Sequence, residues 1–154
     1  MPKRKISYYL WLQLLYKLKV RGEGIKESGA FLLGAPEQNT VTEFICYDDL
    51  DPNCLSNGII EFDGAGYVPL WDYCQKNKLT VLADIHTHPG TWTGQSVADQ
   101  EHPMIKQKGH IALIVPNYAA KPLQLLKGVG VYEYKGNNCW DTLLTESGLK
   151  LSWL

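Results

Sequence analysis

Two uninterrupted apolar runs, LTVLADI at 79–85 and HIALIV at 110–115, constrain the fold of this chain most. Each has the length of a strand and is continuously apolar instead of alternating, a pattern typical of strands covered on both faces. Such strands need a layer of other elements on each side. Residues 7–20 have apolar positions at helical spacing, and residues 67–77 are compatible with a helix whose start is limited by Pro69. The sequence therefore predicts an α/β fold with a mixed β-sheet flanked by helices.

Shorter segments complete the predicted sheet. AFLLG at 30–34 and TVTEFICY at 40–47 have strand composition and are separated by a turn-like segment, which predicts a hairpin. VGVYEY at 129–134 is a further strand, followed by the turn cluster at 136–138. LKLSWL at 149–154 is a candidate terminal strand.

The length and charge of the chain limit its class. A chain of 154 residues is most simply one domain, spanning 1–154, and it is long enough to bury a hydrophobic core. Its formal net charge is -1, and it contains no long block of one sign. Nucleic-acid binding normally leaves a basic footprint, so no nucleic-acid partner is expected.

The four cysteines indicate a reducing environment. Cys46, Cys54, Cys74 and Cys139 are scattered along the chain and form no C-x-x-C pair. Secreted disulfide frameworks are denser, and thiolate zinc sites need closely spaced cysteines. We therefore expect a cytoplasmic protein, in which any bound metal has nitrogen and oxygen ligands.

The N-terminal segment resembles a targeting sequence only in part. Residues 3–5 are basic and precede an apolar stretch, but Gln13 interrupts that stretch and no small-residue cleavage site follows. The helical spacing of its apolar residues favours a packing helix, and no run is long enough to span a bilayer. No membrane association is expected.

Two histidines at the end of the first apolar run suggest metal chemistry. His86 and His88 lie on the same face if the strand continues through them, so both imidazoles can reach one ion. Ser96 and Asp99 are three residues apart, which places them on one face of a helical turn. A loop between His88 and Ser96 can fold this turn back over the histidines. Two histidines, one carboxylate and a water form the open arrangement of a catalytic zinc.

Each half of this pattern also has a purely structural interpretation. An isolated H-x-H is more often accidental or structural than metal-binding. Ser96 and Asp99 resemble a helix capping box, with Asp in place of the usual Glu or Gln. A capped turn still presents Asp99, however, so the two interpretations are compatible. The combination of the two halves favours a metal site.

The stretch HTHPGTWTGQSVAD, from His86 to Asp99, resembles the signature of the JAMM metalloproteases, also called MPN-plus or JAB. That signature is H-x-H-P, with seven residues between the second His and a Ser, followed by x-x-D. Upstream, ESGAFLLG at 27–34 resembles the E-x-G-x-x-L-L-G segment of the family. The similarity extends from about Glu27 to the strand at 110–115 and is greatest to compact prokaryotic members. It implies a JAB/MPN fold, with layers similar to those of cytidine deaminases.

The resemblance also implies a role for each matching residue. His86, His88 and Asp99 would bind one Zn²⁺ ion. Glu27 would be the general base that takes a proton from water and passes it to the leaving amine. Ser96 would donate a hydrogen bond to the oxyanion of the tetrahedral intermediate. This is hydrolysis without a covalent acyl-enzyme.

Glu27 is preferred as the base over Glu23, Glu37 and Glu43. An acidic residue in this half of the chain is more often a solvated surface charge. Glu27 is distinguished because it comes just before a buried strand and beside Gly29, which allows a neighbouring chain to approach closely.

Several other aromatic and histidine residues have either a functional or a structural interpretation. Trp92, inside the loop between the ligands, either contacts substrate or anchors the loop. His102 is either close to the metal ligands or a loop histidine without such a role, and His110 is expected to be structural. Trp71 and Trp140 are expected to pack in the core or against the sheet.

The commonest substrates of the resembled family are ubiquitin and ubiquitin-like proteins, so a zinc isopeptidase or peptidase acting on them is the leading hypothesis. Their slender tail can bind as an added strand, and the Asp-, Asn-, Gly- and Pro-rich loop at 48–66 is a candidate edge for it. Processing of a sulfur-carrier protein would use the same chemistry. A metal-free MPN scaffold is disfavoured by the complete motif, and a two-metal phosphoesterase by the missing carboxylates. The sequence does not indicate an oligomeric state.

Overall fold

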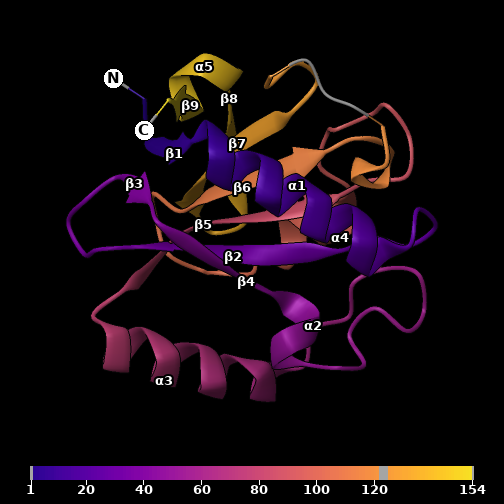
Figure 1. Ribbon diagram of the computed structural model, residues 1–154, viewed down its shortest axis with the longest axis horizontal. Coiled ribbons are helices and arrows are strands. Elements are labelled where there is room, and N and C mark those ends of the chain that lie inside the picture. The colour runs from indigo at the N-terminus through magenta and orange to yellow at the C-terminus, as the bar shows by residue number, and fades with distance from the viewer. Residues whose placement is uncertain (1, 122–124, 154) are drawn as a thin grey trace.

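The computed structural model describes residues 2–121 and 125–153, and a six-stranded sheet forms its centre (Figure 1). The strand order is β4-β2-β5-β6-β7-β8. Their bounds are β2 Gly29–Gly34, β4 Glu43–Cys46, β5 Thr80–Thr87, β6 Ile111–Val115, β7 Gly130–Gly136 and β8 Cys139–Leu143. β5 and β6 pair in parallel and the other neighbours are antiparallel, so the predicted mixed sheet is confirmed.

A second sheet of three strands joins the two ends of the chain. It contains β3 (Thr40–Val41), β1 (Arg4–Ser7) and β9 (Leu149–Ser152), in the order β3-β1-β9 with parallel pairing. The predicted terminal strand is thus confirmed as β9, although its last residue, Leu154, lies outside the described residues. β1 was not predicted, because its four residues contain only one buried side chain and its pairing partners are distant in sequence.

Helices cover the two faces of the central sheet, as predicted (Figure 1). α1 (Tyr8–Gly22) lies on one face, and α3 (Tyr67–Asn77) lies on the other. α1 begins after Ser7, whose hydroxyl oxygen accepts a hydrogen bond from the backbone N–H of Leu10. The remaining helical segments are short: α2 Tyr47–Leu50, η1 Gly64–Gly66, α4 Val97–Glu101, η2 Asn117–Ala119 and α5 Thr145–Gly148.

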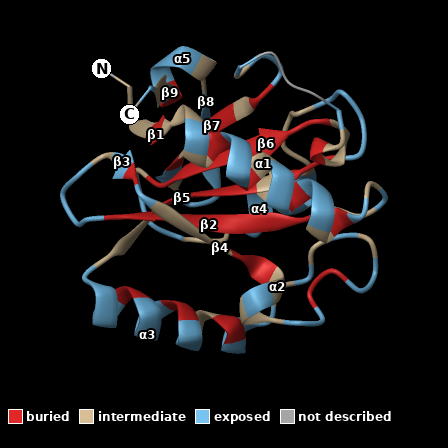
Figure 2. Cartoon of the chain, viewed as in Figure 1, coloured by how far each residue is buried: buried red, intermediate tan, exposed pale blue. Residues whose placement is uncertain are grey.

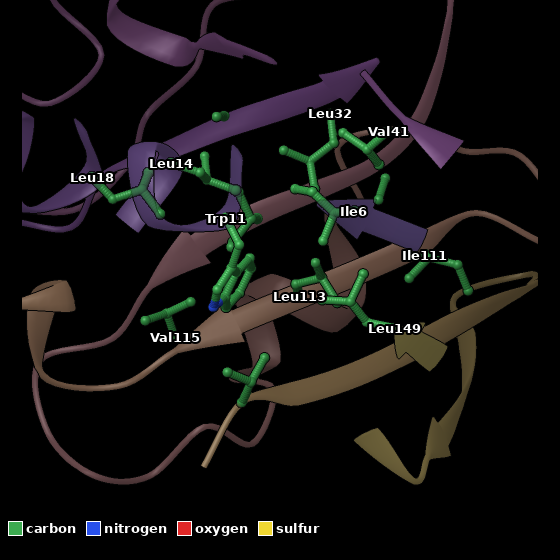
Figure 3. Close-up of a cluster of buried hydrophobic side chains, with 14 of the residues drawn as sticks. Ile6, Trp11, Leu14, Leu18, Leu32, Val41, Ile111, Leu113, Val115 and Leu149 are labelled. Atoms are coloured by element: carbon green, nitrogen blue, oxygen red, sulfur yellow. The ribbon is translucent and has the colours of Figure 1, made fainter. Parts of the chain in front are cut away.

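The alternation of side chains on β2 feeds two hydrophobic clusters, one on each face of the sheet. Leu32 belongs to the same cluster as Trp11 on the buried face of α1, and Figure 3 draws it next to Val41 and Ile6. Phe31 points to the opposite face and packs with Leu70 of α3. Because both faces are covered, all six residues of β2 are buried, and the buried strands fill the centre of Figure 2. The continuous apolar runs were therefore correctly interpreted as strands that are covered on both faces.

Three local predictions need correction. The strand at 40–47 is divided between the two sheets at Thr42, and its last residue, Tyr47, begins α2. The loop at 48–66 contains the rest of α2 and the short helix η1. β8 was missed, although Asn137 and Asn138 have positive φ angles and form a two-residue connection between β7 and β8. Such a turn is a known signal for a β-hairpin.

The cysteines agree with the prediction from their spacing, whereas Trp71 does not lie where it was predicted. All four cysteines are free, as expected from their spacing, and three of them are buried. Trp71, predicted to pack in the core or against the sheet, is instead 47% exposed and stacks on Tyr67 at the surface of α3. Within the described residues, no helix combines the length and the apolar character needed to cross a membrane.

Truncation of α1 residues tests this packing. Leu14→Ala removes a fully buried side chain from the cluster beneath α1, and we expect it to lower the free energy of unfolding by about 2–5 kcal/mol. Leu12→Ala, the matched control on the same helix, removes a side chain that is 46% exposed and should cost clearly less. Urea denaturation measures both, and equal losses would contradict the described orientation of α1.

Candidate metal centre

β5 carries the two histidines to the edge of a cavity. His86 is near the end of β5, and the backbone N–H of His88 donates to the carbonyl of Val115, which continues the line of the strand by one residue. Thr87 points away and is fully buried, where its hydroxyl oxygen accepts a hydrogen bond from the backbone N–H of Ser28. The two histidine Nε2 atoms lie 3.1 Å apart. Their shared face is the one expected for a continued strand.

Asp99 approaches the histidines from the first turn of α4. The Ser96 hydroxyl oxygen accepts a bond from the Asp99 N–H at 3.0 Å, and the Asp99 carboxylate accepts one from the Ser96 N–H at 2.9 Å. The capping box suggested by the sequence is therefore present. The same carboxylate lies 3.3 Å (Oδ1) from His86 Nε2 and 3.2 Å (Oδ2) from His88 Nε2. The cap and the possible ligand are thus one side chain with two functions.

The spacing of these atoms fits a tetrahedral metal ion. His86, His88 and Asp99 are a possible metal-binding group within the described residues. Ligands about 2.0–2.1 Å from a tetrahedral zinc are separated from one another by about 3.3 Å. The His86 and His88 nitrogens are 3.1 Å apart, near this value, and the two oxygens of Asp99 lie 3.3 Å (Oδ1) from His86 and 3.2 Å (Oδ2) from His88. Two nitrogens and a carboxylate are also a donor set that zinc accepts.

The local electrostatics keep Asp99 ionised. Its partial burial alone would raise the pKa of the carboxyl, but hydrogen bonds from His86 and His88 lower the pKa well below its usual range. Conversely, burial opposes protonation of His86, while Asp99 more than offsets this and raises the pKa of His86. A carboxylate between two imidazoles is a strongly attractive site for a cation.

Glu27 lies beside this cluster because β2 pairs with β5. The antiparallel register places Gly29 opposite His86, and extending that register by two residues places Glu27 opposite His88. Burial raises the pKa of Glu27, and the nearby His86 and His88 partly counteract this. A carboxyl group with a raised pKa is better matched to accepting a proton near neutral pH than an exposed one.

Gly29 has a steric role that explains its position in the E-x-G segment. A Cβ atom on this residue would collide with the ring of Tyr47 and lie 2.7 Å from the carbonyl oxygen of Ile85. Any larger residue would therefore separate β2 from β5 or displace Tyr47. Glycine allows the close approach that brings Glu27 to the histidines.

Trp92 contacts His88 through both its backbone and its ring. The His88 Nδ1 lies 3.2 Å from the Trp92 carbonyl oxygen, and the two rings stack with centroids 5.5 Å apart. In the neutral imidazole, donation from Nδ1 to this carbonyl leaves Nε2 without a proton and able to bind a metal ion. The next residue is also tied down, since the Tyr132 hydroxyl donates to the Thr93 carbonyl at 2.6 Å. The loop therefore orients one of the candidate ligands.

One cavity of about 760 Å³ contains all the residues singled out by the motif. Glu27, Ser96, His102 and the three candidate ligands line it, so His102 lies in the cavity wall rather than away from the site. The Ser96 hydroxyl oxygen accepts its bond from Asp99, which leaves its hydrogen free to donate. Trp140, predicted as a packing residue, also lines the cavity, and its indole N–H donates to the carbonyl of Gln100.

Several other residues that line the cavity were not predicted from the sequence. Asp84 belongs to the same strand face as His86, so the alternation along β5 could have identified it. Tyr47, Phe62 and Tyr67 come from the region after β4, which has no comparable pattern. His110 has the structural role that was expected, because it is buried and its Nε2 lies 2.6 Å from Asp84 Oδ2.

Comparisons with known proteins agree with this fold. The protein named "Probable metalloprotease y4jG" from Sinorhizobium fredii (strain NBRC 101917 / NGR234) is 33% identical over 72 residues, which are 47% of this chain and 42% of that protein. The chain thus matches less than half the length of this relative. No protein-family model matches the chain.

Two solved structures have a similar fold. Protein DSY2949 from Desulfitobacterium hafniense superposes with a TM-score of 0.66 at 16% identity, covering 96% of this chain and 92% of that one. AF2198, a JAB1/MPN domain protein from Archaeoglobus fulgidus, gives a TM-score of 0.53 at 19% identity, covering 97% and 98%. The chain therefore has the JAB1/MPN fold, and the JAMM-type domain indicated by the motif is confirmed at the level of the fold.

The Trp92 contacts lead to a test based on metal affinity. Trp92→Ala removes the ring that stacks on His88 and loosens the loop whose carbonyl orients that histidine. We expect zinc affinity to fall about tenfold, as is typical when a group supporting a metal ligand is removed. Competition with a chromophoric chelator measures this. Trp71→Ala, which removes an exposed ring on α3, is the control, and equal affinities for both variants would contradict the orienting role.

Proposed function

We propose that this chain is a zinc-dependent peptidase or isopeptidase that removes or processes ubiquitin or ubiquitin-like proteins. The observation that carries the proposal is the convergence of three candidate ligands, separated by 3.1–3.3 Å, with Glu27 and Ser96 in the same cavity. The similarity to a probable metalloprotease supports hydrolysis of a peptide or isopeptide bond. His86, His88 and Asp99 would hold the zinc. When bound there, zinc acts as a Lewis acid and lowers the pKa of water from 15.7 to about 7.

The chain's own residues would complete the reaction. Glu27 would take the proton of the attacking water and transfer it to the leaving amine. Its raised pKa makes the carboxylate a better acceptor for the proton of the attacking water. Ser96 would donate its free hydroxyl hydrogen to the oxygen of the attacked carbonyl as negative charge develops there.

The substrate part of the proposal rests on the JAMM-type motif and on the shape of the cavity rim. Residues 59, 60 and 62 line the cavity, and the backbone of Ile60 hydrogen-bonds to Glu27. This segment, which has no regular secondary structure, lies beside the candidate base and can pair with a slender C-terminal tail as an added strand. A cytoplasmic location, which the four free cysteines favour, is part of the same proposal.

The decisive experiment compares native protein with Glu27→Gln on ubiquitin and ubiquitin-like fusions, including a sulfur-carrier-type protein. The amide keeps the size of the side chain but does not accept the proton, so the variant should retain one zinc per chain and lose hydrolysis. Zinc content is measured by mass spectrometry and cleavage by gel electrophoresis. Normal cleavage by Glu27→Gln would refute the base assignment, and a native protein without zinc would instead favour a scaffold.

Substitution of Ser96 separates its proposed role in catalysis from its role as a helix cap. Ser96→Ala removes both the helix cap and the proposed oxyanion donor, so kcat should fall by about 10²–10³. Loss of the cap should cost about 1 kcal/mol of stability. Ser96→Gly also removes the hydroxyl but is tolerated better at a cap position, and it is the control for stability. A kcat within twofold of native for both variants would exclude the oxyanion role.

A further inference from the structure

The floor of the cavity contains a carboxylate that the proposed reaction does not use. Asp84 lies two residues before His86 on the same face of β5 and is only 3% exposed. Ala112 is its register partner on β6, and the small side chain leaves space above this part of the sheet. Asp84 Oδ2 is occupied by His110 Nε2 at 2.6 Å. The other oxygen of the carboxylate remains available to a further donor.

The hydroxyl of Tyr47 is a second polar group in the same part of the cavity. Tyr47 is 1% exposed and lines the cavity, and its hydroxyl lies close to the Asp84 carboxylate but makes no hydrogen bond of normal geometry within the described residues. Burial and the nearby Asp84 raise its pKa well above the usual value, so it is a neutral phenol. Leaving such a group unpaired is costly, and a ligand that reached it would remove that cost.

Aromatic side chains form the walls above this polar floor. Phe62 and Tyr67 pack edge to face with centroids 5.0 Å apart, and both line the cavity. Tyr67 donates its hydroxyl hydrogen to the Met104 carbonyl at 2.5 Å, which fixes its ring. Trp140 lines the same cavity. These walls suit an apolar stem, and their ring faces attract a cation.

We propose that this part of the cavity is a specificity pocket for an arginine or lysine side chain of the substrate, next to the scissile bond. The inference rests on the proposed function, because it uses the candidate zinc site as the position of the reacting carbonyl. Two residues along a strand span about 6.6 Å, which separates Asp84 from His86 by roughly the reach of such a side chain.

The polar groups of the pocket select a basic side chain over others of similar length. Guanidinium and ammonium groups carry several donors and no acceptor, so one group can satisfy both the Asp84 carboxylate and the Tyr47 oxygen. A tyrosine hydroxyl has a single hydrogen to donate. A leucine offers no donor to the Tyr47 hydroxyl or to the second oxygen of Asp84, and a glutamate places a second carboxylate against Asp84.

Cleavage assays on a matched substrate series test this pocket. The series consists of ubiquitin fusions that differ in a single residue. In one set this is the residue before the scissile bond, and in a second set it is the residue after it. In each set the varied residue is Arg, Lys, Tyr, Leu or Glu. Native zinc-loaded protein should cleave the best basic substrate with a kcat/KM at least tenfold above that of its leucine counterpart. A preference for Leu, Tyr or Glu, or no preference, would overturn the proposal.

Two variants test whether Asp84 and Tyr47 cause the preference for a basic side chain. Asp84→Asn should reduce the Arg-to-Leu ratio to about one. Tyr47→Phe keeps the ring that packs on Phe31 and removes only the unpaired hydroxyl, so it should lower the ratio several-fold without lowering the melting temperature. Zinc content should be native in both. An unchanged ratio in folded, zinc-loaded Tyr47→Phe would contradict the role of the hydroxyl.

A binding measurement separates this inference from the proposed function. N-acetyl-arginine amide and N-acetyl-norleucine amide are titrated by NMR into zinc-loaded Glu27→Gln, with and without Asp84→Asn. The arginine compound should bind at least tenfold more tightly, and only when Asp84 is present. If no fusion is cleaved but this difference appears, the reaction proposal fails and the pocket stands. If fusions are cleaved and both compounds bind equally, the pocket proposal fails.

Discussion

The antiparallel pairing of β2 with β5 is the interaction on which the rest of the site depends. Its register places Gly29 against His86 and brings the residues before β2 alongside the end of β5. The close approach requires glycine, because a Cβ atom would meet Tyr47 and the carbonyl of Ile85. Both strands are buried between α1 and α3, so their register is fixed by packing on two faces. The candidate general base and two candidate ligands, from distant parts of the chain, are thereby held on a rigid support.

The other half of the site depends on one short helical turn. α4 has five residues and no buried side chain, so packing contributes little to its position. It is held instead by the capping box between Ser96 and Asp99 and by contacts of the preceding loop with Tyr132. Asp99 is both the capping acid and a candidate ligand, so a bound cation would stabilise the same turn that presents its ligand. Folding of α4 and metal binding are therefore expected to be coupled.

Much of this arrangement could be predicted from the sequence, for identifiable reasons. Continuous apolar runs specify buried strands, and a fixed H-x-H-P to S-x-x-D spacing places ligands on elements with known periodicity. The candidate general base was harder to predict, because the proximity of Glu27 to the histidines depends on strand pairing across about sixty residues, and mainly the motif singled it out. The pairing of β1 with β9, at opposite ends of the chain, had no local signal at all.

The residues that line the cavity were also only partly predictable from the sequence. Asp84 could be placed on the histidine face by counting along β5, but its neighbours Tyr47 and Phe62 come from an irregular region whose path is set by tertiary contacts. Trp71 shows that an aromatic residue in a sequence does not by itself indicate burial, because it lies on the surface. Trp140 packs on Tyr134 of β7, as predicted, and also borders the cavity. Side chains that line a site from loops are therefore the part that required the structure.

The central claim is that His86, His88 and Asp99 bind one zinc ion. X-ray absorption spectroscopy at the zinc edge, on protein purified without chelators, tests it most directly. The account predicts one zinc per chain, with only nitrogen and oxygen ligands at about 2.0–2.1 Å and an imidazole signature from two histidines. Absence of bound zinc after reconstitution, or sulfur scattering at about 2.3 Å, would contradict it.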